Sequence, residues 1–220
     1  MTRMLKLASK SKYLLIVLLL LLTSTVTFSN NVIGNFNNSI GPMVLKDSKI
    51  IVTGDSFAGK FCEYEKNKDL YIIPYARAGC TIDQNQIIMA LALNFDERNI
   101  LISIGVNDQF METPPYRFEA IMRRLLNIGL YYNKNVFMHS YLMYFSSLYN
   151  LKRFSALEYD AIIKRLCEEY DNAYYIDVKD LENPIYISDD NMHYNSLFYD
   201  ELYVRLLNLM LELEKAQEKQ

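Results

Sequence analysis

The sequence predicts an α/β protein, a three-layer α/β/α sandwich with a central parallel sheet of about five strands. The chain has 220 residues, of which 51% are hydrophobic, so it can bury the core of one domain. After residue 48, short β-branched or aromatic runs alternate with longer amphipathic stretches. Strands that alternate with helices form a parallel sheet with helices on both faces, and the connections between its strands are right-handed.

The expected strands are short runs in which β-branched and aromatic residues prevail. They are Lys49 to Thr53, Tyr71 to Tyr75, Asn99 to Ile104, Asn135 to Ser140 and Ala173 to Asp177. Helices are expected from about Phe57, through Gln84 to Leu93, from Pro114-Pro115 through Arg123 to Tyr131, near Leu157 to Tyr170, and over about Ser196 to Glu214. Proline is tolerated in the first turn of a helix, so the proline pair marks the start of the third one.

Residues 1–30 are expected to lie outside the fold and to direct export. Their charged residues are all basic and precede the apolar run Tyr13 to Leu22, which small polar residues follow. As a helix, Tyr13 to Phe28 would span about 24 Å, short of the ~30 Å hydrocarbon core. A cleaved signal and a short uncleaved anchor both remain open. In either case the basic flank stays inside, so the expected location is extracytoplasmic, secreted or tethered to the membrane.

The next segment, residues 31–47, is rich in Asn, Gly and Ser and is expected to be a linker, which leaves residues 48–220 as the domain. Beyond residue 30 the chain holds 19 of its 23 basic residues and all 26 acidic ones. This acidic balance argues against a nucleic-acid partner. Membrane contact is therefore expected only through the N-terminal segment, and the sequence does not indicate an oligomeric state.

The cysteines and histidines suggest neither a disulfide framework nor a metal site. Cys62, Cys80 and Cys167 are an odd number for an exported chain. Cys62 and Cys80 could pair, but free thiols are favoured because a core of this size is stable without disulfide bonds. The chain has only two histidines and no metal-ligand spacing, so no metal and no cofactor is expected.

The block Gly54-Asp55-Ser56 follows the first strand and offers a candidate nucleophile. Ser56 would stand at the start of a helix, where backbone N–H groups and the helix dipole favour a developing anion. A helix cap is the plainer interpretation of a serine at this place, and Asp55 is expected to hold the turn. The segment from Gly54 to Lys60 also matches the first seven positions of a phosphate-binding P-loop, but the eighth is Phe61 rather than Ser or Thr.

Two further blocks follow the second and third strands. Gly79 is either an ordinary turn glycine or a backbone donor. Asn107, in Gly105-Val106-Asn107-Asp108, is either a turn residue or a side-chain donor. The carboxyl ends of parallel strands lie at one edge of a sheet, so Ser56, Gly79 and Asn107 are expected on one rim. Donors gathered there could stabilise the oxyanion of acyl transfer.

The candidate general base is His193, which lies before the last helix. Asp190, three residues earlier, would accept from its Nδ1–H and orient the ring. His139 is the rival base, but it ends an apolar strand, where core packing is the more common role. Asp189 is the rival for Asp190. Together these residues are the groups that acyl transfer through a serine requires.

In residue type, order and spacing these blocks resemble the SGNH hydrolases, also called the GDSL esterase/lipase superfamily. The resemblance covers roughly residues 48 to 212 and implies a flavodoxin-like fold. It implies Ser56, Asp190 and His193 as catalytic residues, and the oxyanion hole as Ser56, Gly79 and Asn107. Among the two acidic candidates, the family spacing Asp-x-x-His selects Asp190.

The resemblance and the export signal together imply an exported serine esterase that needs no cofactor. The expected substrate is a small-molecule or glycan O-acyl ester, above all an O-acetyl ester, on surface or environmental glycans. Two alternatives fit the same motifs: an acyltransferase on the same scaffold, and a surface-binding domain without activity. The complete catalytic set argues against the second alternative.

Overall fold

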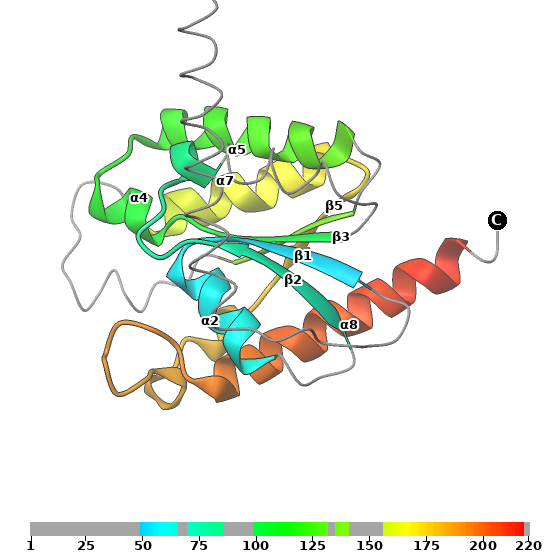
Figure 1. The fold of residues 1–220 in the computed structure, drawn as a ribbon. Coiled ribbons are helices and arrows are strands. Elements are labelled where there is room, and N and C mark those ends of the chain that lie inside the picture. Colours follow the sequence, from blue (N-terminus) through cyan, green and yellow to red (C-terminus); the bar gives the residue numbers. More distant parts are fainter. Residues whose placement is uncertain (1–48, 66–69, 86–98, 132–134, 141–155, 218–220) are drawn as a thin grey trace, which may run out of the picture. The chain divides into compact units, whose positions relative to one another are not determined.

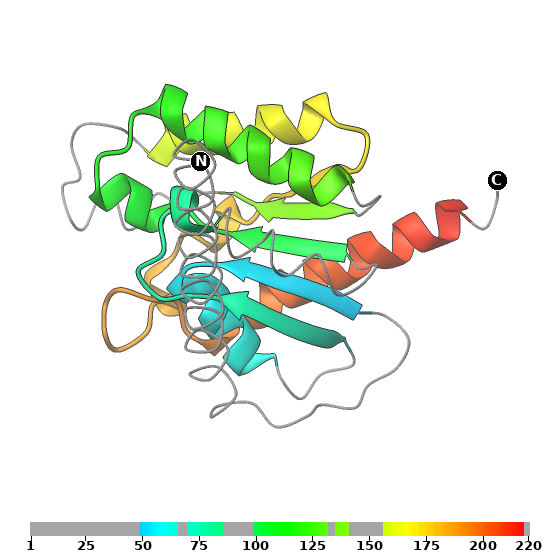
Figure 2. The ribbon, with the colours of Figure 1, turned by 45° about the horizontal axis from the view of Figure 1, so that its top comes forward.

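The computed structural model describes residues 49–65, 70–85, 99–131, 135–140 and 156–217, all of which belong to one compact unit. Its centre is a five-stranded sheet in the order β2-β1-β3-β4-β5, and every neighbouring pair is parallel (Figures 1 and 2). The strands are β1 (Lys49–Gly54), β2 (Tyr71–Ala76), β3 (Asn99–Ser103), β4 (Val136–His139) and β5 (Ala173–Ile176). The predicted parallel sheet of five strands is therefore confirmed.

Helices cover both faces of this sheet, as Figure 1 shows. One face carries α5 (Pro115–Tyr131) and α7 (Ala156–Glu169), and the other carries α2 (Ser56–Tyr64) and α8 (Ser196–Gln217). The sheet is buried between two apolar cores because alternate strand residues enter opposite layers. Ile51 and Ile100 join the α5/α7 core, while Val52 and Leu101 join the α2/α8 core. This arrangement is the predicted three-layer α/β/α sandwich.

The remaining elements are short. A helix that the sequence pattern did not indicate, α4 (Val106–Phe110), follows β3, and the 3₁₀ turns η1 (Lys179–Leu181) and η2 (Pro184–Tyr186) follow β5. Pro115 begins α5, in agreement with the expected start. Of the helix expected over Gln84 to Leu93, residues 82–85 are helical and the rest lies outside the described residues. Residues 1–30 and 31–47 also lie outside them.

The carboxyl ends of the three strands on which the candidate residues depend are level with one another. Gly54 pairs with Ala76 of β2 on one side and with Ser103 of β3 on the other. Figure 2 shows the arrowheads of the strands at the edge where α4 and the segment between β5 and α8 also lie. Gly54 is required here, because a Cβ would stand 1.8 Å from the Ser103 carbonyl oxygen. The register of the sheet thus sets the positions of the loops that follow.

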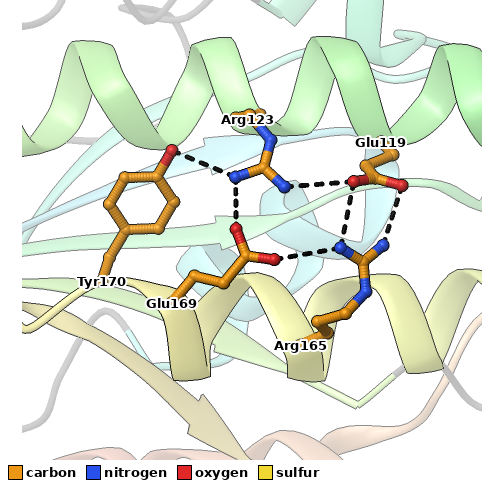
Figure 3. A network of polar contacts seen from close by, with 5 residues as sticks. All are labelled: Glu119, Arg123, Arg165, Glu169 and Tyr170. Carbon is orange, nitrogen blue, oxygen red and sulfur yellow. Dashed lines mark hydrogen bonds and ion pairs between the residues drawn. The ribbon is translucent and has the colours of Figure 1, made fainter.

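A network of four charges joins α5 to α7 on their outer side (Figure 3). Glu119 and Arg123 from α5 pair with Arg165 and Glu169 from α7, and the Tyr170 hydroxyl reaches Arg123. The four charged side chains are all partly open to solvent, so each pair contributes little to stability. The network links the two helices that cover one face of the sheet, and none of its members is a candidate site residue.

Two further findings concern the expected cysteine chemistry and the membrane. Cys62, Cys80 and Cys167 are all buried free thiols. Within the described ranges, no helix has the length and apolar character needed to cross a bilayer.

Candidate active site

Ser56 is the first residue of α2, directly beyond the end of β1. The preceding residue, Asp55, caps the helix, because its Oδ1 accepts a hydrogen bond of 2.9 Å from the Phe57 N–H. The serine itself is therefore not the cap, and the role expected for Asp55 in holding the turn is confirmed. The Ser56 N–H belongs to the first turn of the helix, which has no intrahelical acceptor. This end of α2 is a suitable place for a developing negative charge.

His193 contacts Ser56, although 137 positions separate the two residues along the chain. The His193 Nε2 lies 2.9 Å from the Ser56 Oγ, and its Nδ1 lies 2.7 Å from the Asp190 Oδ2. An ionised carboxylate can only accept, so Nδ1 carries the hydrogen of the neutral ring and Nε2 accepts from the serine hydroxyl. Phe57 flanks the imidazole, with ring centroids 5.3 Å apart. The ring is thereby oriented from two sides, and its side chain is 17% exposed.

Asp190 is kept ionised by donors that surround its other oxygen. The Ser188 hydroxyl and the backbone N–H groups of Met192 and His193 all donate to Asp190 Oδ1. The Ser188 hydrogen bond, followed by those from His193, holds the pKa of Asp190 well below its usual range. The Asp-x-x-His spacing thus has a local cause: the carboxylate folds the tight turn and turns its second oxygen toward the imidazole. The sequence reasoning had not identified Ser188.

Gly79 occupies the third position of a β-turn, where the backbone has a positive φ that favours glycine. The Cys80 N–H donates to the Arg77 carbonyl and closes a β-turn, in which Gly79 has a φ of 73°. A positive φ at the third turn position defines a type II turn and favours glycine. The N–H at this position takes no part in the hydrogen bond of the turn, and Gly79 is exposed.

Asn107 lies in the first turn of α4 and contacts the same turn. Its Nδ2 donates to the Cys80 carbonyl at 3.1 Å, which uses one of the two amide hydrogens and leaves the other for a ligand. Asn107 and the Gly79 turn are therefore held together at the rim where α2 begins. Asn107 lies in a helix rather than in the turn that the sequence offered as its alternative role, because Gly105 caps α4 two positions after the end of β3.

Two carboxyl groups lie buried beneath this rim. Burial raises the pKa of Asp55 to about 7, against the lowering effect of its hydrogen bond from Phe57. Burial likewise raises the pKa of Asp108 to about 6, although its Oδ2 accepts from the Ile82 N–H at 2.9 Å. Each carboxyl caps or links a backbone segment that leads to a candidate residue, so both act in the architecture of the site.

The structure also decides between the alternatives that the sequence left open. The imidazole of His139 contacts Ser103 Oγ at 2.8 Å, whereas His193 is the histidine at Ser56. Asp190 rather than Asp189 is the carboxylate that pairs with it. The P-loop interpretation is wrong, because Gly59 and Lys60 lie within α2 and leave no loop that could cradle a phosphate.

The fold and the site together define a class of protein: an α/β/α sandwich with a Ser–His–Asp series at the carboxyl edge of its sheet. No family model matches the sequence, and no curated protein matches it significantly. Solved structures do. A psychrotrophic esterase from a Pseudoalteromonas species is 14% identical with a TM-score of 0.58, over 74% of this chain and 99% of that one.

Two other solved structures give the same picture. A variant of an acetyl xylan esterase from Geobacillus stearothermophilus is 15% identical with a TM-score of 0.58, over 76% of this chain and 96% of that one. A member of the lipolytic G-D-S-L family from Veillonella parvula is 16% identical with a TM-score of 0.62, over 74% and 97%. The chain has the fold of the SGNH hydrolases, as the sequence resemblance implied.

Proposed function

We propose that this protein is a serine esterase that hydrolyses O-acyl esters through an acyl-enzyme. The observation that carries the proposal is the continuous series of hydrogen bonds from Ser56 through His193 to Asp190. Its three members come from a helix start and a tight turn, and the series ends on a carboxylate held ionised by three donors. A serine, a base and an orienting acid in this order form a nucleophilic triad.

In the first half of the reaction, Ser56 Oγ attacks the ester carbonyl carbon while His193 Nε2 takes the hydroxyl proton. The imidazolium that forms is stabilised by Asp190 through Nδ1–H. The carbonyl oxygen becomes an oxyanion, for which the N–H groups of Ser56 and Gly79 and the free amide hydrogen of Asn107 are the donors. When the tetrahedral intermediate collapses, the C–O bond to the alcohol breaks, and His193 gives its proton to the leaving oxygen.

In the second half, His193 accepts a proton from water as the water oxygen attacks the acyl carbon. The same donors hold the second oxyanion, and its collapse breaks the bond to Ser56 Oγ, which takes the proton back from His193. The products are a carboxylic acid, an alcohol and the unchanged serine. Every proton in this cycle passes through one imidazole nitrogen.

The substrate class we propose is an O-acetyl ester on a glycan outside the cell. Support comes from two sides: one of the similar structures is an acetyl xylan esterase, and the basic and apolar order of residues 1–30 is typical of export. The aromatic composition, with 18 Tyr and 11 Phe, is compatible with sugar-binding surfaces.

An assay with aryl esters tests the activity and the acyl preference together. The full-length protein should hydrolyse a short-chain aryl acetate faster than a long-chain aryl ester, and Ser56→Ala should abolish both rates. Activity that survives in Ser56→Ala would contradict the proposed nucleophile. An acetylated sugar as acyl donor, with a free sugar added as acceptor, separates the two alternatives. An acyltransferase would form newly acylated sugar, whereas an esterase would release the free acid.

Export has its own test. Residues 1–30 are proposed to contribute nothing to the core, so a chain shortened to begin at Asn31 should fold and keep its esterase rate, while losing export from the cell. An unfolded product would contradict the proposed boundary, and export of the shortened chain would contradict the proposed signal.

A further inference from the structure

A second serine–histidine pair lies on the strands beside the nucleophile. Ser103 ends β3 and His139 ends β4, and the register that pairs Ile102 with Met138 places these two residues opposite each other. Ser103 Oγ lies 2.8 Å from His139 Nε2. Ser103 is only 4% exposed, so its hydroxyl group cannot rely on water for an acceptor.

The direction of this hydrogen bond follows from the other side of the ring. His139 Nδ1 lies 3.0 Å from the Ser140 carbonyl oxygen, which can only accept, so Nδ1 carries the hydrogen. Nε2 of the neutral ring is then the acceptor for the Ser103 hydroxyl. Burial lowers the pKa of His139, which favours this neutral form.

Ser103 is connected directly to the turn that carries the nucleophile. Its carbonyl oxygen accepts from the Asp55 N–H at 3.2 Å, and the same oxygen is the atom that excludes any side chain at Gly54. Asp55 in turn caps the helix that Ser56 begins. The end of β3 therefore contacts and holds the turn Gly54-Asp55-Ser56 that carries the proposed nucleophile.

His139 is also connected to the segment that carries the base. Its ring packs edge-on against Phe198 at a centroid distance of 6.5 Å, and Phe198 stacks on Tyr194 at 4.0 Å. Tyr194 follows His193 in the chain and contacts Phe57, which flanks the His193 ring. A continuous row of rings thus joins the two histidines on the face of the sheet covered by α2 and α8.

We propose that His139 is a positioning residue for the esterase reaction: by accepting from Ser103 it holds the end of β3, and with it the Asp55–Ser56 turn, so that Ser56 Oγ meets His193. This inference rests on the proposed function. The pair is not a second catalytic centre, because Ser103 is buried and a carbonyl group rather than a carboxylate stands behind the His139 ring.

Three substitutions of His139 in the full-length protein separate its two hydrogen bonds. His139→Gln can place an amide oxygen near the former Nε2 and keep an acceptor for Ser103. His139→Asn can place an amide nitrogen near the former Nδ1 and keep only the donor to Ser140. His139→Ala keeps neither. With an aryl acetate as substrate, Asn and Ala should lower kcat by roughly tenfold to a hundredfold with KM within about twofold, while Gln stays within about threefold of wild type.

Several outcomes would overturn the proposal. Equal rates in all three variants would show that the pair does not position the nucleophile. A His139→Gln protein as impaired as His139→Ala would show that the Ser103 acceptor is not what matters. Thermal unfolding measures how much of each variant is folded. If the loss of kcat equals the loss of folded protein, His139 has only a structural role.

Imidazole nitrogen spectra test the same inference without turnover, so failure of the proposed function does not affect them. The chain has two histidines, and the His139 substitutions assign both. His139 should show the tautomer with hydrogen on Nδ1. The His193 signals, which report the contact with Ser56, should move in His139→Ala and stay in place in His139→Gln. Unmoved His193 signals in His139→Ala, or hydrogen on Nε2 of His139, would contradict the proposal.

Discussion

The two serine–histidine pairs of this protein have almost the same hydrogen-bond length and very different surroundings. Ser56 and His193 are 2.9 Å apart, and Ser103 and His139 are 2.8 Å apart. Behind His193 stands the carboxylate of Asp190, whereas behind His139 stands the backbone carbonyl of Ser140. A carboxylate stabilises the imidazolium that forms when the ring takes a proton, and a carbonyl does so far less.

The two serines differ as much as the two histidines. Ser56 begins a helix, where free N–H groups can receive the charge of a tetrahedral intermediate, and it is partly exposed. Ser103 ends a central strand and is buried. Distance alone therefore does not make a nucleophile. In the proposed mechanism, the charge behind the base and the donors around the serine distinguish the reactive pair from the pair that positions it.

The comparison is tested most strongly by removing each serine. Ser56→Ala should lower kcat by roughly 10⁴-fold or more, and the Ser56→Ala/His193→Ala double variant should be little worse, because members of a triad act as one unit. Ser103→Ala should have a much smaller effect, comparable with that of His139→Ala. Steady-state kinetics on an aryl acetate measures all four proteins, and a larger loss in Ser103→Ala than in Ser56→Ala would reverse the two assignments.

The carboxylate of Asp190, which orients His193, can be replaced without losing the hydrogen bonds that hold the turn from Ser188 to His193. Asp190→Asn keeps an oxygen for the N–H groups of Met192 and His193 but removes the charge, so kcat should fall by roughly 10³–10⁴-fold while the thermal midpoint stays near that of wild type. Asp189→Ala, the neighbouring carboxylate, is the matched control and should leave the rate unchanged. Equal effects of the two substitutions would mean that Asp190 does not orient the base.

The proposed oxyanion donors are expected to serve the Ser56–His193 pair. Asn107→Ala should lower kcat by about 10²–10³-fold, which corresponds to about 2.7–4 kcal/mol of barrier, with little change in thermal stability. Asn107→Asp offers an acceptor of the same shape in place of the donor and should be at least as impaired. If stability and activity fall together in Asn107→Ala, the hydrogen bond to the Cys80 carbonyl is its main role.

The smallest expected effect concerns Asp55, which joins the two pairs. Burial raises its pKa to about 7 in the folded chain, from an ordinary value of 3.8. Between about pH 4 and 7 the folded chain holds a proton that the unfolded chain has released, so the free energy of unfolding falls as pH rises. Asp108, with a pKa of about 6, acts in the same direction, and Asp190 titrates below this window. His139, whose pKa is lowered by burial, acts in the opposite direction and is unchanged in the comparison below.

Urea unfolding at about pH 5 and about pH 7.5 measures this slope. Asp55→Asn keeps a capping side chain for α2 but cannot ionise, so its stability should depend less on pH than that of wild type. A wild-type slope in this variant would show that Asp55 is not the group that titrates.

Most of the fold could be predicted from the sequence because its signals are local. Each of the five strands is a short apolar run, and Pro115 marks the start of α5. The five residues of α4 are too few to show a helical period, so this element was missed. Of the site, Asp190 and His193 were recognisable because they match the Asp-x-x-His spacing of the family that the sequence resembles, and the structure places both in one tight turn.

The sequence by itself determined which chemical groups are present and the order in which they occur: a serine after the first strand, donors after the next two, and an acid and base before the last helix. Only the tertiary structure decided which histidine meets which serine. Ser56 and His193 are 137 positions apart, and Ser103 and His139 are 36 apart. Contacts over such separations are set by the register of the parallel strands and by the packing of α2 and α8 on one face of the sheet. Neither the register nor this packing can be predicted from a local sequence pattern.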